Sequence, residues 1–324
     1  MPHQTNISPA AAGGAGGAGG AIQAVPLRRP GRWVTAGILA FVVFFLMQAW
    51  ITNERMQWPT VGKYLFAPTV LEGLFTTIWL TVVAMVIGVV GGILVAVMRQ
   101  SDNPILATIS WFFIWLFRGV PLLVQILVWY FLAAIVPQII IGVPWGPELF
   151  AFDTNALITQ TTAALLALGL SEAAYMAEIV RAGMSSVDRG QAEAAHALGF
   201  TNQQTLRRVV LPQALRVIIP PTGNEVINML KATSLVSVIA VPELLTSVQA
   251  IYSQNFQQIP LLVVACFWYL VVVSVLSVGQ HFLERHFARG VHGAPSSRRA
   301  KRLPPNPGPI TEAVSLMSAE ERDR

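Results

Sequence analysis

Long apolar stretches recur along most of this chain and constrain its fold more than any other feature. Those long enough to act as membrane spans cover 33–51, 72–98, 119–142, 158–181, 222–242 and 259–283. A helix needs about 20 mostly apolar residues to cross the hydrocarbon core of a bilayer. Inside lipid the backbone must also satisfy its own hydrogen bonds, which helices do. The sequence therefore predicts an all-α fold, a polytopic helical membrane protein with six transmembrane helices.

The composition excludes an ordinary soluble domain. Hydrophobic residues make up 54% of the chain and charged residues 11%, whereas soluble domains average about 45–50% and about 25%. The single cysteine, Cys266, lies in an apolar stretch, so a disulfide framework or a zinc site cannot be built from it. The five histidines are scattered without metal-ligand spacing. We therefore expect neither a metal site nor a cofactor.

One apolar stretch, 104–117, is too short to cross the membrane, and the sequence Arg118-Gly119-Val120-Pro121 interrupts it. We expect this stretch to form a helix that lies in the membrane interface. The third span is then expected to begin near Pro121, because proline is well tolerated in the first turn of a helix.

The segments at the two ends of the chain differ from the rest. Residues 1–32 include an Ala/Gly-rich stretch and predict a disordered cytoplasmic tail. The apolar run 33–51 is long and lacks a cleavage pattern, so we interpret it as an uncleaved span rather than a signal peptide. Residues 288–324 contain a basic stretch and predict a second disordered cytoplasmic tail.

Lysines and arginines are distributed unevenly around the predicted spans. With the N-terminus placed in the cytoplasm, sixteen of them fall on the cytoplasmic side and only Arg55 and Lys63 on the other. Cytoplasmic loops of membrane proteins carry an excess of Lys and Arg. We therefore expect both termini and the loop 183–221 to lie in the cytoplasm.

The loop 183–221 carries a helix–turn–helix pattern. Strong helix formers cover 191–198, and Gly199 follows where a helix ends in a left-handed residue. Thr201 and Gln204 then have the spacing of a capping box, which predicts a second short helix through Val210. We expect Pro212 to close that helix.

Taken alone, the segment 195–209 also matches a DNA-binding helix-turn-helix, with a glycine in the turn and arginines after it. Its place between two spans and its lack of a third helix argue against DNA recognition, so no nucleic-acid partner is expected. A structured loop that merely connects two spans remains an alternative.

The same loop resembles the "EAA" motif of bacterial ABC importer permeases. The matching residues are Glu193, Ala194, Ala195, Gly199, Leu211 and Pro212, and Val209 stands where the family most often has Ile. Three further segments resemble the polar amino-acid (histidine/glutamine-type) permeases: 117–125 (FRGVPLLVQ), 174–183 (AYMAEIVRAG) and 231–235 (KATSL). Val120 and Ala232 depart from that pattern. The resemblance covers about 66–287, a five-span family core, so 33–51 is an extra N-terminal span.

The resemblance implies a transport subunit rather than an enzyme, placed in the cytoplasmic (inner) membrane. The chain lacks a phosphate-binding loop, since its one Gly-Lys pair, Gly62-Lys63, is followed by Tyr64. Two ATPase subunits are then expected to bind the cytoplasmic loop. A solute-binding protein is expected outside, on loops 52–71, 143–157 and 243–258, and a second permease subunit, identical or different, completes the complex. The implied substrate is an amino acid.

The resemblance also assigns the loop its role in ATPase coupling. The residues expected to carry this role are Gly190, Gln191, Glu193, Ala194, Ala195, Gly199, Leu211 and Pro212. Two alternatives stay open: an ABC importer permease for another small polar solute, and an ion-driven secondary transporter without any ATPase.

Polar side chains inside the predicted spans are candidates for the substrate path, because ionisable groups in the membrane are costly. In the fifth span Asn224, Asn228 and Lys231 share one helix face. We hypothesise that this face lines the path; alternatively, Lys231 pairs with a neighbouring subunit or with backbone carbonyls. In the fourth span, Glu172 and Tyr175 are the corresponding candidates.

Glu178 and Arg181 lie near the cytoplasmic end of the fourth span. Their i, i+3 spacing predicts an ion pair on one helix face. We therefore assign Glu178 a structural rather than a substrate-binding role.

Overall fold

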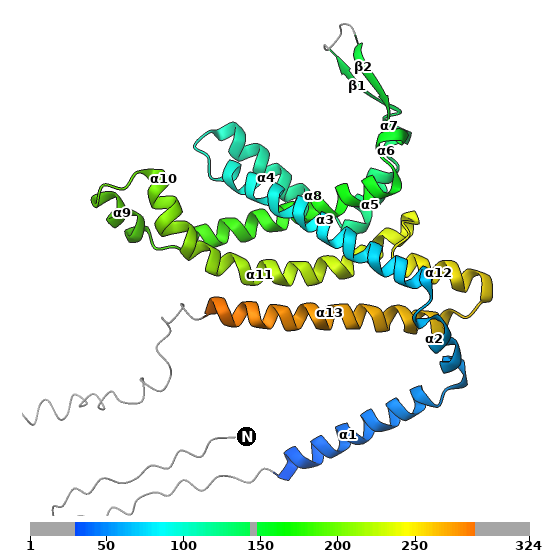
Figure 1. Cartoon of the computed structure of the whole chain (residues 1–324). Coiled ribbons are helices and arrows are strands. Elements are labelled where there is room, and N and C mark those ends of the chain that lie inside the picture. The colour runs from blue at the N-terminus through cyan, green and yellow to red at the C-terminus, as the bar shows by residue number, and fades with distance from the viewer. Residues whose placement is uncertain (1–29, 143–147, 289–324) are drawn as a thin grey trace, which may run out of the picture. The chain divides into compact units, whose positions relative to one another are not determined.

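The computed structural model describes residues 30–142 and 148–288 (Figure 1). The chain divides into two units, Met1–Glu54 and Arg55–Arg324. The predicted tails fall outside the described residues, except where the first and last helices extend into them. The predicted disorder of these tails therefore stays a prediction.

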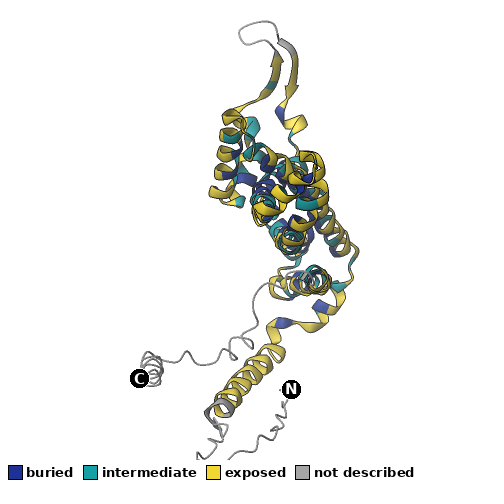
Figure 2. Ribbon diagram, turned by 90° about the vertical axis from the view of Figure 1, so that its left-hand side faces the viewer, coloured by how far each residue is buried: buried dark blue, intermediate teal, exposed yellow. Residues whose placement is uncertain are grey.

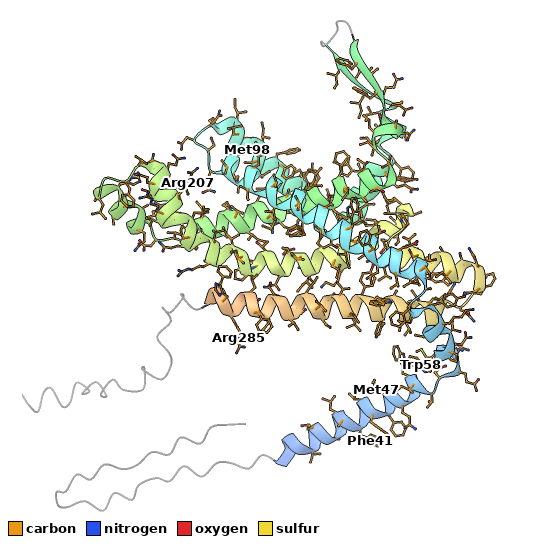
Figure 3. All side chains as sticks on the ribbon, viewed as in Figure 1. Phe41, Met47, Trp58, Met98, Arg207 and Arg285 are labelled. Carbon is orange, nitrogen blue, oxygen red and sulfur yellow. The ribbon has the colours of Figure 1, made fainter. Side chains whose placement is uncertain are left out.

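The first unit contains α1, Pro30–Ile51. Every side chain described in this helix is exposed within the chain (Figure 2), among them Phe41 and Met47, which project from the helix in Figure 3. Its length and apolar composition meet the requirements for a membrane span. These side chains therefore suit contact with lipid or with another subunit.

The second unit is built almost wholly from helices. In chain order the elements from Glu54 onward are η1 Glu54–Met56, α2 Trp58–Leu65, α3 Pro68–Arg99, α4 Pro104–Gly119, α5 Leu122–Tyr130, α6 Leu132–Ile135, β1 Gln138–Gly142, β2 Glu148–Asp153, α7 Thr154–Leu157, α8 Gln160–Ser185, α9 Arg189–Ala197, α10 Asn202–Thr205, η2 Leu206–Val210, α11 Leu211–Ala232, η3 Thr233–Ile239, α12 Leu244–Asn255 and α13 Gln258–Ala288.

The core forms where α3 and α8 pack along each other, joined by α5 and α11. Small residues on α8, such as Ala164 and Ala167, are fully buried against Leu80 and Ile126. On α3, a side chain at Gly88 would overlap Glu172, so this glycine permits the close approach. In its most apolar window α8 is 61% buried and α13 only 17%. The central helix is therefore α8, whereas α13 presents most of its surface outward.

The helix α13 is attached to the bundle by polar contacts at separate levels. Gln280 donates a hydrogen bond to the carbonyl oxygen of Pro220 on α11 (2.7 Å). Nearer the start of α13, the indole N–H of Trp268 donates to the carbonyl oxygen of Leu65 at the end of α2 (2.8 Å). These bonds fix the position of a helix whose apolar surface alone would not distinguish protein from lipid.

A buried carboxylate, Glu243, joins three helices. Its side chain has 0% exposure and caps α12 by accepting hydrogen bonds from the amides of Leu245 (2.9 Å) and Thr246 (2.7 Å). The hydroxyl of Tyr269 on α13 also donates to it (2.9 Å). Thr77 on α3 accepts a hydrogen bond from the Leu244 amide (3.0 Å) beside it. A charge buried in this way stays stable only because its oxygens are well supplied with donors.

The predicted span 119–142 is not a single helix, which corrects the sequence expectation. The helix α5 ends at Tyr130, and the strand β1 begins at Gln138. The helix α4 instead extends the apolar stretch 104–117 to Gly119 and meets α5 at an angle of 103°. Val120 and Pro121 explain the break, because the residue before a proline avoids the helical conformation.

The strands β1 and β2 form an antiparallel hairpin that the sequence did not predict. Ile139 pairs with Phe152 and Ile141 with Phe150, so all four side chains share one face of the hairpin. Thr154 closes its base by donating through its amide to the carbonyl oxygen of Pro137 (3.0 Å). Of the expected outer loops, 143–157 therefore contains β2 and α7, while 243–258 is mostly α12.

Pro212 does not end the second short helix, and the expectation that it would is wrong. The chain stays helical from α10 through η2 into α11, and Pro212 lies in the first turn of α11. The π-helical turn of η2 directly precedes it. A widened π turn accommodates the missing amide and the ring of a proline, so the helix continues without a stop.

The helices of the described residues support a multi-span membrane protein. Four of them, α1, α3, α8 and α13, are each long and apolar enough to cross a membrane, and two bent pairs bring the number to as many as six. The bent pairs are α4 with α5, and the run 202–239 with α12, which bends by 43°. The expected spans 72–98 and 259–283 thus lie within single helices. The expected span 158–181 does so from Gln160 onward, where α8 begins.

We predict that Glu243→Ala destabilises the folded subunit by about 3–5 kcal/mol, because several buried donors lose their acceptor together. Thermal unfolding of the detergent-solubilised protein measures this loss as a lower midpoint. The control is Glu72→Ala, which removes an exposed carboxylate from α3. Equal midpoints for the two variants would contradict the anchoring role of Glu243.

Candidate functional site

The loop after α8 contains α9, a tight turn and α10. Asp188 caps α9 by accepting a hydrogen bond from the amide of Gly190 (2.7 Å). Gly199 has a φ of 82°, as expected for a left-handed residue at the end of this helix. The amide of Gly199 donates to His196 (2.9 Å) and that of Phe200 to Ala195 (3.1 Å). This pair of bonds is the Schellman motif, which satisfies the last carbonyls of a helix.

The second helix of the loop starts with the predicted capping box. The amide of Gln204 donates to the hydroxyl of Thr201 (3.3 Å), and the amide of Thr201 donates to the Gln204 side chain (2.9 Å). The guanidinium of Arg208 lies 6.0 Å from the centre of the Phe200 ring. Local sequence signals therefore determine the shape of this loop, largely independently of the membrane spans.

The predicted coupling residues divide by exposure. Gln191, Glu193, Ala194, Leu211 and Pro212 are exposed, as are Gly190 and Gly199, whereas Ala195 is buried. Ala195 faces the rest of the loop, since α9 packs against α10 and η2. Sequence reasoning did not single out Leu198, an apolar side chain that is 79% exposed at the end of α9.

A second group of predicted residues surrounds a small hollow between α5, α8 and α11. This acidic hollow has a volume of about 280 Å³, and its polar lining includes Glu172, Tyr175, Glu225 and Asn228. Glu172 is 4% exposed, and its Oε1 atom has no hydrogen-bond partner among the described residues. The hollow thus brings together three of the five side chains expected on the substrate path.

Asn224 and Lys231 lie elsewhere. They are exposed and do not line the acidic hollow, although they share α11 with Asn228. The structure adds Glu225, which the sequence analysis passed over and which lines the same hollow as Glu172. The sequence did contain a signal for Glu225: it is an acidic residue within the predicted apolar span 222–242, directly after Asn224.

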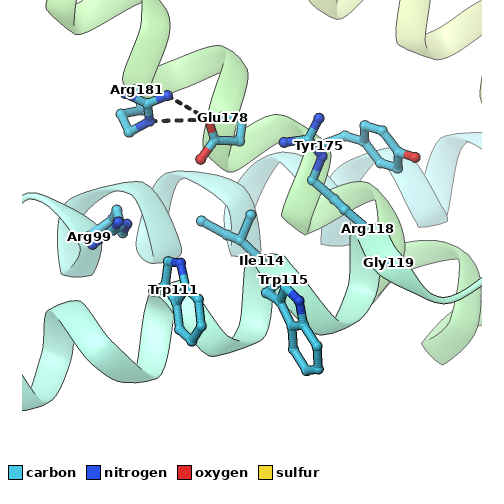
Figure 4. Close-up of a pocket in the computed structure, with 9 residues that line it drawn as sticks. All are labelled: Arg99, Trp111, Ile114, Trp115, Arg118, Gly119, Tyr175, Glu178 and Arg181. Carbon is cyan, nitrogen blue, oxygen red and sulfur yellow. Dashed lines mark hydrogen bonds and ion pairs between the residues drawn. The ribbon is translucent and has the colours of Figure 1, made fainter.

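A larger, basic hollow lies next to the acidic one (Figure 4). It has a volume of about 780 Å³ and is lined by Arg99, Arg118 and Arg181, with Tyr175 and Glu178. Glu178 accepts a hydrogen bond from Arg181 at 2.7 Å, which confirms the predicted ion pair. The guanidinium of Arg118 lies 5.3 Å from the centre of the Tyr175 ring. Tyr175 thus lines both hollows.

Comparison with known proteins identifies the family. Residues 88–289 match the family described as binding-protein-dependent transport system inner membrane component. The arginine transport system permease protein of Corynebacterium glutamicum is 42% identical over 93% of this chain and 94% of its own length. This chain belongs to the family of binding-protein-dependent transport system inner membrane components.

Other relatives match a shorter part of the chain. The L-cystine transport system permease protein of Bacillus subtilis is 36% identical over 70% of this chain and 89% of its own length. A crystal structure of an amino acid ABC transporter with histidines is 33% identical, covers 68% of this chain and 95% of that one, and has a TM-score of 0.59. The Corynebacterium match covers 93% of this chain and is long enough to include the residues of α1.

Membership in this family makes the chain a multi-pass membrane component of a transport system and not an enzyme. The family description names a binding protein, and a solved relative is part of an ABC transporter. The family description therefore makes a binding protein a partner of the system to which this chain belongs. The alternative of an ion-driven carrier without such a partner does not fit this family.

Proposed function

We propose that this chain is the permease subunit of an amino-acid importer and that the acidic hollow is a substrate site for an amino acid with a cationic side chain. The observation that carries this proposal is the buried carboxylate of Glu172. Within 30–142 and 148–288, its Oε1 atom lacks a hydrogen-bond partner and the lining of the hollow includes neither Lys nor Arg.

A buried carboxylate without a partner is costly, and an incoming cation removes that cost. Glu225 faces the same hollow and adds a second negative charge. Asn228 offers both hydrogen-bond donors and acceptors to the rest of the substrate. An ammonium or guanidinium group both donates hydrogen bonds to Glu172 and balances its charge, whereas a neutral side chain can only donate hydrogen bonds and an anionic one is repelled.

Two of the relatives are named for amino acids that can carry a cationic side chain. The Corynebacterium relative is an arginine transport permease, and the solved relative is an amino acid transporter with histidines. Other relatives are glutamate/aspartate and cystine permeases. The family as a whole therefore supports an amino acid, and the charge of the acidic hollow favours a cationic one over another small polar solute.

The loop with α9 and α10 is proposed to receive the force of the ATPase. Glu193, Ala194 and Leu198 form an exposed face on α9, with small, charged and apolar side chains that suit a protein contact. Asp188 and Gly199 hold the two ends of α9 rigid through backbone hydrogen bonds. Only three residues separate α8 from α9, so a push on α9 reaches α8 directly.

The orientation follows from the charge distribution along the chain. We place both termini and the loop 183–221 in the cytoplasm, and α12 and the hairpin on the opposite side, where the binding protein docks. Two ATPase subunits would serve a pair of permease subunits, either two copies of this chain or this chain with a second permease. Symmetric pairs are the commonest form of such assemblies.

The substrate proposal predicts that the purified complex, without its binding protein, binds L-arginine more tightly than L-citrulline. Citrulline has nearly the same shape but no charge. Glu172→Gln is expected to weaken arginine binding by about 10- to 100-fold and to leave citrulline binding nearly unchanged, because one charge-assisted bond is lost. Equilibrium binding with radiolabelled amino acids measures both, with Glu72→Gln as the control. Equal affinity of the unaltered protein for the two amino acids would contradict the proposal.

The coupling proposal predicts a graded series at Gly199. A side chain there meets no atom within 4 Å, so only the positive φ restricts the residue. Gly199→Asn is expected to keep the turn, and Gly199→Val to strain it by about 1–2 kcal/mol or more. We expect the Val variant to insert in the membrane yet to lose ATPase copurification and binding-protein-stimulated ATP hydrolysis. Glu193→Lys should do the same by reversing a docking charge. Full stimulation in both variants would remove the loop from the coupling path.

The proposed orientation is tested with single cysteines in a Cys266→Ala background. Ser185 and Gln254 are both exposed, at the end of α8 and on α12. An impermeant thiol reagent should label Gln254→Cys in intact cells and Ser185→Cys only after the membrane is permeabilised. Labelling of Ser185→Cys from outside would invert the topology.

A further inference from the structure

Arg118 lies at an unusual place in the chain. It is the last but one residue of α4, beside the 103° break between α4 and α5. Fourteen residues of α4 precede it, and at about 1.5 Å each they place it about 21 Å along the helix from Pro104. Its side chain is exposed within the chain and borders the basic hollow.

The guanidinium of Arg118 lies over the ring of Tyr175. The 5.3 Å separation from the ring centre is within the range of a cation–π interaction. The carboxylate of Glu178 attracts Arg118 electrostatically, but its hydrogen bond goes to Arg181. Arg118 is therefore bound to α8 through an aromatic face, a contact that is easily broken and re-formed.

Tyr175 forms part of the wall of both hollows. On one side is the acidic hollow with Glu172, and on the other the basic hollow with Arg99, Arg118 and Arg181. Glu172, Tyr175 and Glu178 follow one another at three-residue intervals along α8, so they lie near one helix face. The two hollows therefore adjoin at Tyr175, and Arg118 lies beside that tyrosine in the basic hollow (Figure 4).

We propose that the Arg118–Tyr175 pair is the barrier between the substrate site and the cytoplasmic side of the permease. The inference rests on the proposed function of the acidic hollow. The stacked side chains close the passage sterically, and the positive charge of Arg118 repels a cation that leaves Glu172. Arg118 is thus a gating residue and does not itself bind the substrate.

The surrounding helices allow the pair to separate. Tyr175 is on α8, which leads directly into the coupling helix α9, whereas Arg118 is on α4 at its break with α5. Gly119 follows Arg118 with open space where a side chain would project. A displacement of α8 by the ATPase therefore moves Tyr175 relative to Arg118 and opens the passage when ATP is used.

The barrier is tested by leakage without ATP. Proteoliposomes that contain the assembled permease–ATPase complex are loaded with a radiolabelled amino acid that the unaltered complex transports, and its escape is followed without nucleotide. Arg118→Gln and Tyr175→Leu are expected to raise the leak about three- to tenfold, as the loss of one cation–π contact predicts. Tyr175→Phe keeps the ring and should restore most of the barrier.

Two further variants separate the contact from general charge effects. Arg216→Gln removes an exposed arginine from α11 and should leave the leak at its original level. Arg99→Gln removes a charge from the basic hollow without touching the Tyr175 ring and should have a clearly smaller effect than Arg118→Gln. If Arg99→Gln and Arg118→Gln raise the leak equally, the charge of the hollow and not the stacked pair sets the barrier, and the proposal is wrong.

The leak assay can fail independently of the arginine–citrulline binding test. If Tyr175→Leu and Arg118→Gln assemble with the ATPase but leak no more than the original complex, the barrier is elsewhere, even if arginine binding at Glu172 is confirmed. Should Arg118→Gln not assemble, the comparison of Tyr175→Leu with Tyr175→Phe decides the question alone. A failure of the arginine–citrulline test would leave the leak of the variants measurable with whichever amino acid is carried.

Discussion

The bundle depends on the buried carboxylate of Glu243, because it holds α3, α12 and α13 at one point. In lipid, apolar surfaces gain little from packing on one another, so polar contacts and close backbone approach must hold the helices in position. Glu243 supplies such contacts by capping α12 and accepting a hydrogen bond from Tyr269. Gln280 plays a similar part between α13 and α11. The long, apolar helix α13 is thereby kept in register with the rest.

This arrangement leaves α8 as the central helix on which the functional features are ordered. One end leads into the coupling loop, and the other parts of the same helix present Glu178, Tyr175 and Glu172 in turn. In the proposed mechanism the carboxylate of Glu172, whose Oε1 atom has no hydrogen-bond partner in the described part of the chain, attracts a cation, and the arginines nearer the loop oppose its passage. Opposite charges in adjacent compartments are a simple physical means of holding a cationic solute until the helices move.

Much of the coupling loop was predictable from the sequence, because its signals are local. The left-handed Gly199 and the capping box of Thr201 with Gln204 depend on residues within a few positions of one another, as does the ion pair of Glu178 with Arg181 in α8 before the loop. The expectations that failed concern longer stretches. Pro212 was expected to end a helix, but the π turn before it accommodates the proline. The run 119–142 was expected to be one span, but it divides into helix and hairpin.

By itself the sequence determined the membrane environment, the helical class and most of the spans, because apolar length and charge asymmetry are properties of contiguous residues. It also brought Glu172 and Tyr175 forward as candidates, since polar side chains stand out in an apolar run. Only the tertiary structure decided that Glu225 joins them, that Lys231 does not and that Arg118 lies over Tyr175. These relations connect residues from different helices. They follow from the 103° bend after α4 and the packing of α11 on α8, which no local pattern encodes.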